Sequence, residues 1–388
     1  MMNISIVTAT RAEYGLLYPL LIELRKFESD RLKIELIVTG THLSDEYGMT
    51  VHDIERDAVR IDEVVEIPVV SETRLSIALN QAETLAKFAT LFDKKKYDAV
   101  VLLGDRYETL MFATAAYDLH IPIVHLYGGD TTEGALDEGI RHSITKMSFL
   151  HFATNEISRQ RIIQMGEMPE RVFNYGATGT DNIVKLEKMT KFEALQSVGL
   201  EDCRYGLCTY HPVTLEDGDI RRKILDFLDA LSRFPDIEFI VTKSNADHGG
   251  SAINALLEER AKEQENVHIY SSLGMKRYLS LMSYAEAVVG NSSSGIMEAP
   301  SFGVPTVNIG SRQKGRLRAA STIDCDEGTD SIAHAIELAL STEMKNRSKG
   351  VESPYGDGHA GERIAREIIM ELSHPVDLRK SFYDLKFA

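Results

Sequence analysis

The chain has 388 residues, a length typical of two or three domains, and its contents of 43% hydrophobic and 26% charged residues are ordinary for a globular protein. Its formal net charge of -16 argues against general binding to nucleic acid, whose phosphates need an excess of Lys and Arg. An anionic small molecule is compatible with this charge, because a helix N-terminus or a local Arg cluster binds phosphate even in an acidic protein.

Short β-rich runs alternate with helical patterns in the first half of the chain. Residues 4–7 predict a first strand, and the apolar side chains of residues 16–27 then fall on one helix face. Residues 34–38 predict the next strand, and the nearly all-apolar run 99–103 is typical of a strand covered on both faces. Residues 122–126 predict a further strand after another helix. This order indicates an α/β fold with a doubly wound parallel sheet.

The alternation restarts after a polar segment at residues 185–191. The β-rich runs that follow are residues 205–210, 238–242, 267–270, 287–290 and 306–309. The sequence therefore predicts two Rossmann-like domains, residues 1–185 and 186–372, that face each other across a cleft. Residues 362–372 have a helical pattern and can cross back to the first domain, and the tail, residues 373–388, is expected to pack there.

Signals for metal sites, export and membrane insertion are missing. The three cysteines, Cys203, Cys208 and Cys325, form no C-x-x-C pair, which argues against a zinc ribbon or a thioredoxin-like site. Their odd, low number suits a reducing compartment. Residues 1–7 lack the basic start and long apolar run of a signal peptide, and no apolar run approaches the roughly eighteen residues of a membrane span. We expect a cytoplasmic protein that does not enter the membrane.

Common nucleotide and hydrolase motifs are also absent. The first strand-to-helix turn, residues 8–15, lacks the G-x-G-x-x-G fingerprint of dinucleotide-binding proteins. Residues 310–316 resemble a P-loop only superficially, because Arg316 and Leu317 stand where Lys and Ser or Thr are required. Residues 290–295 do not match G-x-S-x-G, so a serine hydrolase is weakly supported.

Polar residues gather where the predicted strands end, and ligands of open α/β sheets bind beyond those ends. They are Arg11, His42, Asp105, the acidic loop of residues 130–138, His211 and residues 292–294. We expect these side chains to converge on the cleft between the domains. Carboxylates crowded together, as in the acidic loop, shift one another's pKa values and suit proton transfer.

Each of these residues also has a structural interpretation. Asp105 can cap the helix that begins near Tyr107, and a lone histidine such as His42 or His211 is more often structural than catalytic. We interpret His125 and His142 as structural.

A second group of residues fits a nucleotide diphosphate. Small residues at 291–295 let backbone N–H groups approach a phosphate, although Ser292 can equally be a simple N-cap. Arg312, with Arg316 and Arg318, follows the next strand and can neutralise a diphosphate or form a solvated basic face. Glu298 can accept two ribose hydroxyls, or it only stabilises the dipole of its helix.

Six motifs in register carry a family resemblance. They are residues 10–15 (TRAEYG), 39–43 (TGTHL), 104–108 (GDRYE), 140–146 (IRHSITK), 211–212 (HP) and 290–295 (GNSSSG). Each motif alone is weak, but in this order the chain resembles the UDP-N-acetylglucosamine 2-epimerases from about residue 3 to about residue 372. The resemblance is to the hydrolysing branch, which makes N-acetylmannosamine for sialic acid.

The resemblance implies a glycosyltransferase-B-type fold with the active site in the interdomain cleft, no metal, no nicotinamide cofactor and a homodimer. It implies loss of UDP and of the C2 proton to give a 2-acetamidoglucal, and then addition of water at C1 with protonation of C2 on the opposite face. Free UDP and N-acetylmannosamine are the products.

Site residues carry over motif by motif. Asp105 and Asp137 are expected as catalytic carboxylates, and His211 is expected near the leaving phosphate or the sugar. The residues expected to hold the UDP-sugar are Arg11, His42, Ser292, Ser293, Ser294, Gly295, Glu298 and Arg312.

The acidic loop departs from the family pattern at one position. Many relatives carry Glu directly before the Gly-Gly pair, where this chain has Tyr127, and a tyrosine with a pKa near 10 is no ordinary base at neutral pH. We expect Asp130 or Glu133 to supply the carboxylate, and favour Asp130 because Gly128 and Gly129 can turn it inward. Alternatively, Tyr127 itself handles a proton, or the activity is altered.

Three other functions share these features. A close relative acting on a 2,4-diacetamido-trideoxy sugar nucleotide, as in the legionaminic acid pathway, differs only in its sugar pocket. A glycosyltransferase of the same fold needs an acceptor before it releases UDP. A catalytically silent nucleotide-sugar-binding protein binds UDP without turnover.

Overall fold

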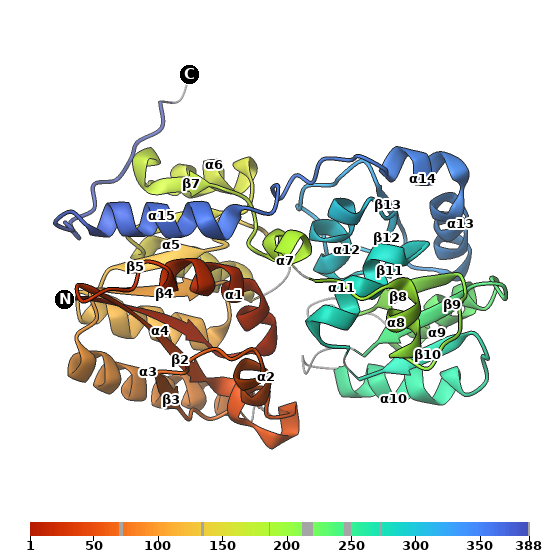
Figure 1. The fold of residues 1–388 in the computed structure, drawn as a ribbon, viewed down its shortest axis with the longest axis horizontal. Coiled ribbons are helices and arrows are strands. Elements are labelled where there is room, and N and C mark those ends of the chain that lie inside the picture. Colours follow the sequence, from red (N-terminus) through yellow and green to blue (C-terminus); the bar gives the residue numbers. More distant parts are fainter. Residues whose placement is uncertain are drawn as a thin grey trace. The chain divides into compact units, whose positions relative to one another are not determined.

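The computed structural model describes residues 1–69, 73–132, 136–185, 187–211, 220–243, 250–271 and 273–386. The chain forms two compact units (Figure 1). The first unit comprises residues 1–130, 136–181 and 358–388, and the second comprises residues 131–135 and 182–357.

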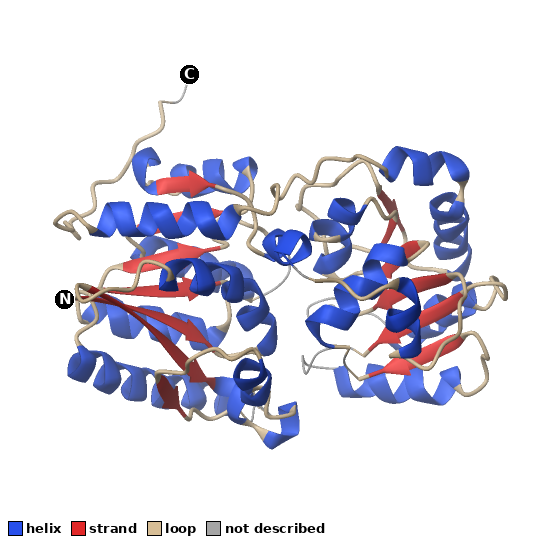
Figure 2. Ribbon diagram, in the orientation of Figure 1, coloured by secondary structure: helices blue, strands red, loops and turns tan. Residues whose placement is uncertain are grey.

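The first unit is built on a seven-stranded, all-parallel sheet in the order β3-β2-β1-β4-β5-β6-β7, with helices on both faces (Figure 2). Its strands are β1 (Met2–Thr8), β2 (Leu32–Thr39), β3 (Glu63–Val65), β4 (Ala99–Leu103), β5 (Ile123–Leu126), β6 (Leu150–Ala153) and β7 (Val172–Asn174). Its helices are α1 (Arg11–Arg25), α2 (Val51–Arg56), α3 (Arg74–Lys95), α4 (Tyr107–Asp118), α5 (Asp137–Met147), α6 (Glu156–Gln164), the start of α7 (Gly179–Lys185) and α15 (Ala360–Leu372). Short 3-10 turns span Gly40–Leu43, Asp45–Tyr47 and Pro169–Arg171.

The second unit repeats this architecture with a six-stranded parallel sheet in the order β10-β9-β8-β11-β12-β13. Its strands are β8 (Tyr205–Thr209), β9 (Glu238–Thr242), β10 (Val267–Tyr270), β11 (Ala287–Gly290), β12 (Thr306–Ile309) and β13 (Thr322–Cys325). Its helices are α8 (Lys191–Gln196), α9 (Ile220–Leu231), α10 (Gly250–Ala261), α11 (Gly274–Tyr284), α12 (Ser293–Met297), α13 (Thr329–Leu340) and α14 (Thr342–Ser348), with a 3-10 turn at Ala299–Phe302. The predicted fold of two doubly wound α/β units is thereby confirmed.

Helix α15 belongs to the first unit, in line with the crossing back considered for residues 362–372, although the predicted second domain extended to residue 372. The apolar face of α15, which includes Ile364 and Ile368, is buried in one core with Leu17 and Leu20 of α1. Gly361 permits this approach, because a Cβ there would lie 3.1 Å from the α1 backbone. Burial of this face against α1 explains why the chain returns to the first unit.

Asp181 fixes the start of α15. Its side chain is fully buried, and its two carboxylate oxygens accept the N–H groups of Ala360 and Gly361 at 2.9 and 2.8 Å. These are donors that no helical carbonyl can satisfy, and a carboxylate also interacts favourably with the positive end of the helix dipole.

Asp181→Asn is expected to destabilise the first unit by about 1–3 kcal/mol, because the amide presents N–H groups to a backbone donor and removes the charge. Differential scanning calorimetry measures the effect. Glu362→Gln is the control, since it removes a carboxylate from the same first turn of α15 that is exposed and pairs with Arg366, an interaction worth about 0.3–0.5 kcal/mol. Equal melting shifts for the two variants would contradict this role for Asp181.

None of the helices in the described ranges combines the length and apolarity needed to cross a membrane.

Candidate functional site

The carboxyl end of β1 leads into a well-capped helix. Thr10 and Glu13 form a capping box at the start of α1, and the Glu13 carboxylate accepts the N–H groups of Ala9 and Thr10 at 2.8 and 3.1 Å. Burial raises the pKa of Glu13 to about 7. Arg11, expected to bind the nucleotide, is the first residue of α1 and is exposed.

His42 is fully buried after β2. Its Nε2 lies 3.0 Å from the Thr8 hydroxyl and its Nδ1 lies 2.8 Å from the Thr50 hydroxyl. Burial lowers the pKa of His42 to about 4, so the ring is neutral at neutral pH. These contacts fit the structural alternative for His42 better than direct contact with a ligand.

The carboxyl end of β4 carries an ion-pair network centred on Arg141, a residue that the sequence analysis did not select as a site residue. The guanidinium of Arg141 is buried and bonds to the Asp105 carboxylate through Nη2. Its Nη1 donates to Glu138 Oε2 at 2.9 Å and to the backbone oxygen of Asp130 at 2.8 Å. The side chain of Asp105 is 26% exposed, so Arg141 holds a carboxylate that solvent still reaches.

The first turn of α5 brings further carboxylates to this network. Asp137 is the first residue of α5 and is exposed, four residues before Arg141 on the same helix. Glu138 Oε1 also lies 3.2 Å from His142 Nε2, within hydrogen-bond distance. The predicted carboxylates Asp105 and Asp137 therefore belong to two elements that Arg141 ties together.

Asp130 is held by one of its two oxygens. Its Oδ1 accepts hydrogen bonds from Thr154 at 3.1 Å, from Asn155 at 3.4 Å and from Ser158. Within the described part of the chain, its Oδ2 accepts no hydrogen bond. One anchored and one unpaired oxygen are what an oriented proton acceptor requires. Glu133, the other residue proposed to complete the site, lies outside the described residues.

The hydroxyl of Tyr127 is committed to hydrogen bonds within the first unit. It accepts the N–H of Gly179 at 3.2 Å and lies 3.3 Å from Thr178 Oγ1. The Thr178 hydroxyl donates to the Leu16 carbonyl at 2.6 Å, so Tyr127 supplies the proton of the Tyr127–Thr178 bond. Tyr127 also adopts a positive φ of 66°, uncommon for a residue other than glycine. Its contacts fit a residue that anchors the start of α7.

His125 supports the backbone beside Asp105. Its Nε2 lies 2.8 Å from the Gly104 carbonyl, which can only accept, so Nδ1 accepts from the Thr145 hydroxyl at 3.2 Å. Burial lowers the pKa of His125 to about 4. These contacts fit the structural interpretation of His125.

In the second unit, the predicted diphosphate residues 292–295 form the start of one short helix. Ser292 caps α12, and its hydroxyl accepts the N–H of Ser294 at 3.4 Å, while Ser293 is the first residue of the helix. Gly295 packs against β12, where a Cβ would come within 2.8 Å of the Thr306 methyl group. Glu298 follows α12, and burial raises its pKa to about 7, partly opposed by a hydrogen bond from Ser294.

His211, expected near the leaving group, lies after β8 and is buried. Burial, and secondarily the charge of Arg312, lowers the pKa of His211 to about 3, so the ring is neutral over the working pH range. The Arg312 guanidinium donates to the Asn291 backbone oxygen at 3.0 Å. The second unit thus brings His211, Arg312 and the start of α12 to the same edge of its sheet.

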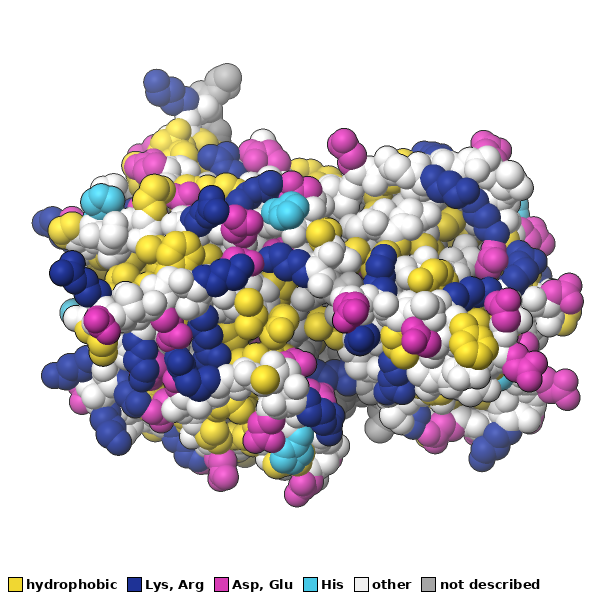
Figure 3. Space-filling view, in the orientation of Figure 1, with side chains coloured by type: hydrophobic (Ala, Val, Ile, Leu, Met, Phe, Trp, Pro, Cys, Tyr) yellow, Lys and Arg dark blue, Asp and Glu magenta, His cyan; other side chains and the backbone are white. Residues whose placement is uncertain are grey.

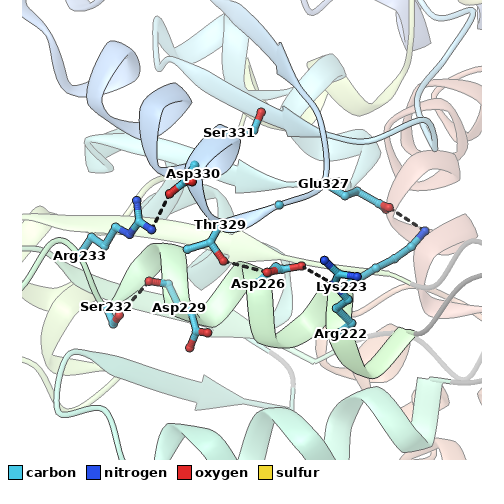
Figure 4. Close-up of a pocket in the computed structure, with 11 residues that line it drawn as sticks. Arg222, Lys223, Asp226, Asp229, Ser232, Arg233, Glu327, Thr329, Asp330 and Ser331 are labelled. Carbon is cyan, nitrogen blue, oxygen red and sulfur yellow. Dashed lines mark hydrogen bonds and ion pairs between the residues drawn. The ribbon is translucent and has the colours of Figure 1, made fainter.

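A separate cavity of about 760 Å³ opens between the length of α9 and the start of α13 (Figure 4). Its charges are largely compensated internally: Lys223 pairs with Glu327 and Arg233 pairs with Asp330, both at 2.7 Å. Charged side chains of both signs also alternate over the face of each unit drawn in Figure 3. The cavity is therefore a poorer candidate for a diphosphate than the segment around Arg312 and α12.

Comparisons with known proteins agree on one family. A family model described as UDP-N-acetylglucosamine 2-epimerase matches residues 25–369. The chain is 38% identical to the GDP/UDP-N,N'-diacetylbacillosamine 2-epimerase (hydrolyzing) of Campylobacter jejuni, covering 99% of both chains. It is 37% identical to the polysialic acid biosynthesis protein P7 of Escherichia coli, covering 99% of this chain and 98% of that one.

A solved structure supports the fold. The UDP-GlcNAc 2-epimerase of Neisseria meningitidis, crystallised with UDP-GlcNAc, superposes with a TM-score of 0.84 at 20% identity, over 95% of this chain and 100% of that one.

Proposed function

This chain belongs to the UDP-N-acetylglucosamine 2-epimerase family, and from that premise we propose that it is a hydrolysing 2-epimerase that converts UDP-N-acetylglucosamine and water into N-acetylmannosamine and UDP. The observation that carries the proposal is the buried Arg141 guanidinium, which holds the partly exposed Asp105 carboxylate beside the first turn of α5. Such an arrangement supplies oriented carboxylates for proton transfer at a carbon atom.

The first half of the proposed reaction breaks two bonds. The C1–O bond to UDP breaks and its electron pair leaves with UDP, while the C2 proton passes to a protein base and the C1–C2 double bond forms. Carboxylates such as Asp105 stabilise the positive charge that develops at C1 as UDP departs. His211, Arg312 and residues 292–295 are the groups we assign to the departing diphosphate, and Arg11 to the nucleotide.

The second half adds water across that double bond. Water adds its oxygen to C1 and loses a proton to a carboxylate, while C2 receives a proton on the face opposite to the one it lost. Asp130 and Asp137 are our candidates for these proton transfers: the Asp130 carboxylate is anchored through Oδ1, and Asp137 is exposed at the start of α5. Because C2 loses its proton on one face and gains a proton on the opposite face, the product is the epimer at C2.

Turnover in heavy water tests this function. We expect free UDP and N-acetylmannosamine carrying deuterium at C2, because the proton that C2 receives comes from solvent through a protein group. Mass spectrometry of the sugar and chromatography of the nucleotide give the result. Formation of epimeric UDP-sugars only, or UDP release that depends on an added acceptor, would refute hydrolytic epimerisation.

A second candidate substrate is a 2,4-diacetamido-trideoxy sugar nucleotide. The observation that favours it is the 38% identity to the Campylobacter jejuni relative, whose name gives diacetylbacillosamine as its sugar. Including both sugar nucleotides in the heavy-water experiment distinguishes the candidates, because the better substrate has the higher kcat/KM.

UDP binding should depend on pH through Glu298, if its carboxylate accepts the ribose hydroxyls. The pKa near 7 leaves this group mostly charged at pH 8 and mostly protonated at pH 6, so affinity should fall as pH falls through 7. The change expected from this group alone is about tenfold between pH 8 and pH 6. Isothermal titration calorimetry on the protein and on Glu298→Gln measures it, and the variant corrects for titration of UDP. Identical pH dependence in both proteins would contradict this role.

A further inference from the structure

A pair of side-chain hydrogen bonds from Asn291 encloses the backbone of His211. Asn291 Oδ1 accepts the His211 N–H at 2.7 Å, and Asn291 Nδ2 donates to the His211 carbonyl at 2.8 Å. The Asn291 side chain is almost completely buried. One carboxamide thus satisfies both polar backbone groups of a single residue, a bond pattern that requires one acceptor and one donor side by side.

These two side-chain hydrogen bonds, the Asn291 clamp, lie where two neighbouring strands separate. Thr209 and Gly290 are the last register pair of β8 and β11, and the N–H of Asn291 donates to the Thr209 carbonyl at 3.1 Å. Beyond that pair, the two segments are joined by the Asn291 side chain, whose hydrogen bonds to His211 replace the backbone bonds of the sheet. Gly290 permits this close approach, because a Cβ there would come within 2.0 Å of the Thr209 oxygen.

The backbone of Asn291 is held from a third segment. Its carbonyl accepts hydrogen bonds from Arg312 Nη1 at 3.0 Å and from the buried Gln313 Nε2 at 2.8 Å. Asn291 is the residue before the α12 cap. It therefore connects His211 to the segment that contains Arg312. Because the Arg312 and Gln313 bonds go to a backbone oxygen, a substitution of the Asn291 side chain removes the clamp on His211 and leaves these two bonds in place.

We propose that Asn291 is a positioning residue, which holds His211 in register with the diphosphate-binding segment through its two side-chain bonds to the His211 backbone. The inference rests on the proposed function for the role of His211 in turnover. Asn291 acts through His211, because its own N–H and its side chain are used for hydrogen bonds to Thr209 and His211. A misplacement of His211 by about 1 Å is enough to lower turnover by up to about a hundredfold.

Two substitutions test this assignment against a matched control. Asn291→Ala removes both clamp bonds. Asn308→Ala removes a similarly buried amide on β12, whose Nδ2 donates to Asp324 at 2.6 Å. We expect kcat to fall about ten- to hundredfold in Asn291→Ala and by less than about twofold in Asn308→Ala, with UDP affinity in both within about threefold of the unmodified protein. A loss of UDP affinity equal to the loss of kcat in Asn291→Ala would overturn the proposal.

Asn291→Asp gives an independent readout through pH. A carboxylate can accept the His211 N–H but repels the His211 carbonyl, whereas a protonated carboxyl group has one acceptor and one donor, like the original amide. The ratio of the kcat of Asn291→Asp to that of the unmodified protein should therefore rise as pH is lowered. A ratio that is constant with pH would contradict the clamp.

A measurement without turnover separates this inference from the proposed function. The 15N signals of the His211 ring, identified with a His211→Gln variant, should move in Asn291→Ala and stay in place in Asn308→Ala. If none of the tested sugar nucleotides is converted but these signals move as expected, the proposed function fails and the positioning contact stands. Unchanged His211 signals in Asn291→Ala would overturn the inference even if the enzyme turns over.

Discussion

Replacing Asp105 by Asn is expected to lower kcat by about 10²–10⁴-fold while the fold and UDP binding are nearly unchanged. The substitution is almost isosteric, and the amide oxygen can still accept a hydrogen bond from Arg141. In the proposed reaction, the negative charge that stabilises the cationic centre and the capacity to take a proton are both lost. Steady-state kinetics gives kcat, and calorimetry gives UDP affinity and thermal stability.

Asp118→Asn is the matched control for this experiment. Asp118 is the last residue of α4, the helix that begins two residues after Asp105, and it is exposed. Its substitution should leave kcat within about twofold, because exposed surface changes rarely alter stability by more than about 0.5 kcal/mol. Near-normal turnover of Asp105→Asn would show that another carboxylate performs the chemistry.

The central strands could be predicted from the sequence because burial on both faces makes them continuous apolar runs. Every residue of β4 is buried, and the predicted bounds 99–103 are those of the structure. β3, β6, β7 and β13 were not predicted. β3 and β7 have three residues each, and β3 leaves Val64 54% exposed at a sheet edge, so neither produces a long apolar run. Short edge strands depend on pairing with a neighbour that local sequence does not reveal.

From topology alone, the candidate site could be predicted only where residues follow strands. Asp105, His211 and residues 292–294 stand at strand ends, so topology alone places them at the ligand edge of a sheet. Arg141 lies in the middle of α5 and was missed, because its partner Asp105 is 36 residues away in the chain. A local signal existed: Arg141 follows Asp137 by four residues and Glu138 by three, spacings that bring charges together on one helix face.

The structure sharpens the question posed by Tyr127. Its hydroxyl is used to hold the start of α7, which makes proton transfer by Tyr127 a poor alternative. Asp130 has an anchored Oδ1 and, among the described residues, an unpaired Oδ2, so our prediction that it completes the site has a geometric basis. The backbone oxygen of Asp130 also accepts from Arg141, which makes the position of the acidic loop depend on the same guanidinium that holds Asp105.

Arg141→Lys should show how much of the site depends on the fork shape of that guanidinium. Lysine keeps the positive charge, but a single ammonium group cannot donate simultaneously to Asp105, Glu138 and the Asp130 backbone in the same geometry. We expect kcat to fall by about 10²-fold, because Asp105 and Asp130 both lose a fixed partner. The loss of stability should be about 1–3 kcal/mol, less than for a fully buried pair, since the two carboxylates are 26% and 31% exposed.

Arg159→Lys provides the comparison that isolates the effect of Arg141→Lys. Arg159 on α6 also pairs with a glutamate three residues earlier, Glu156, and donates to a backbone carbonyl, that of Val172 at 2.9 Å. Among the described residues, it bonds to none of the proposed catalytic carboxylates. Its substitution should change stability by less than about 1 kcal/mol and leave kcat within about twofold. Kinetics and calorimetry on both variants show whether Arg141 orients the catalytic carboxylates or only stabilises the fold. If Arg141→Lys loses stability but keeps its kcat, the guanidinium supports only the fold, and the carboxylates do not need it for proton transfer.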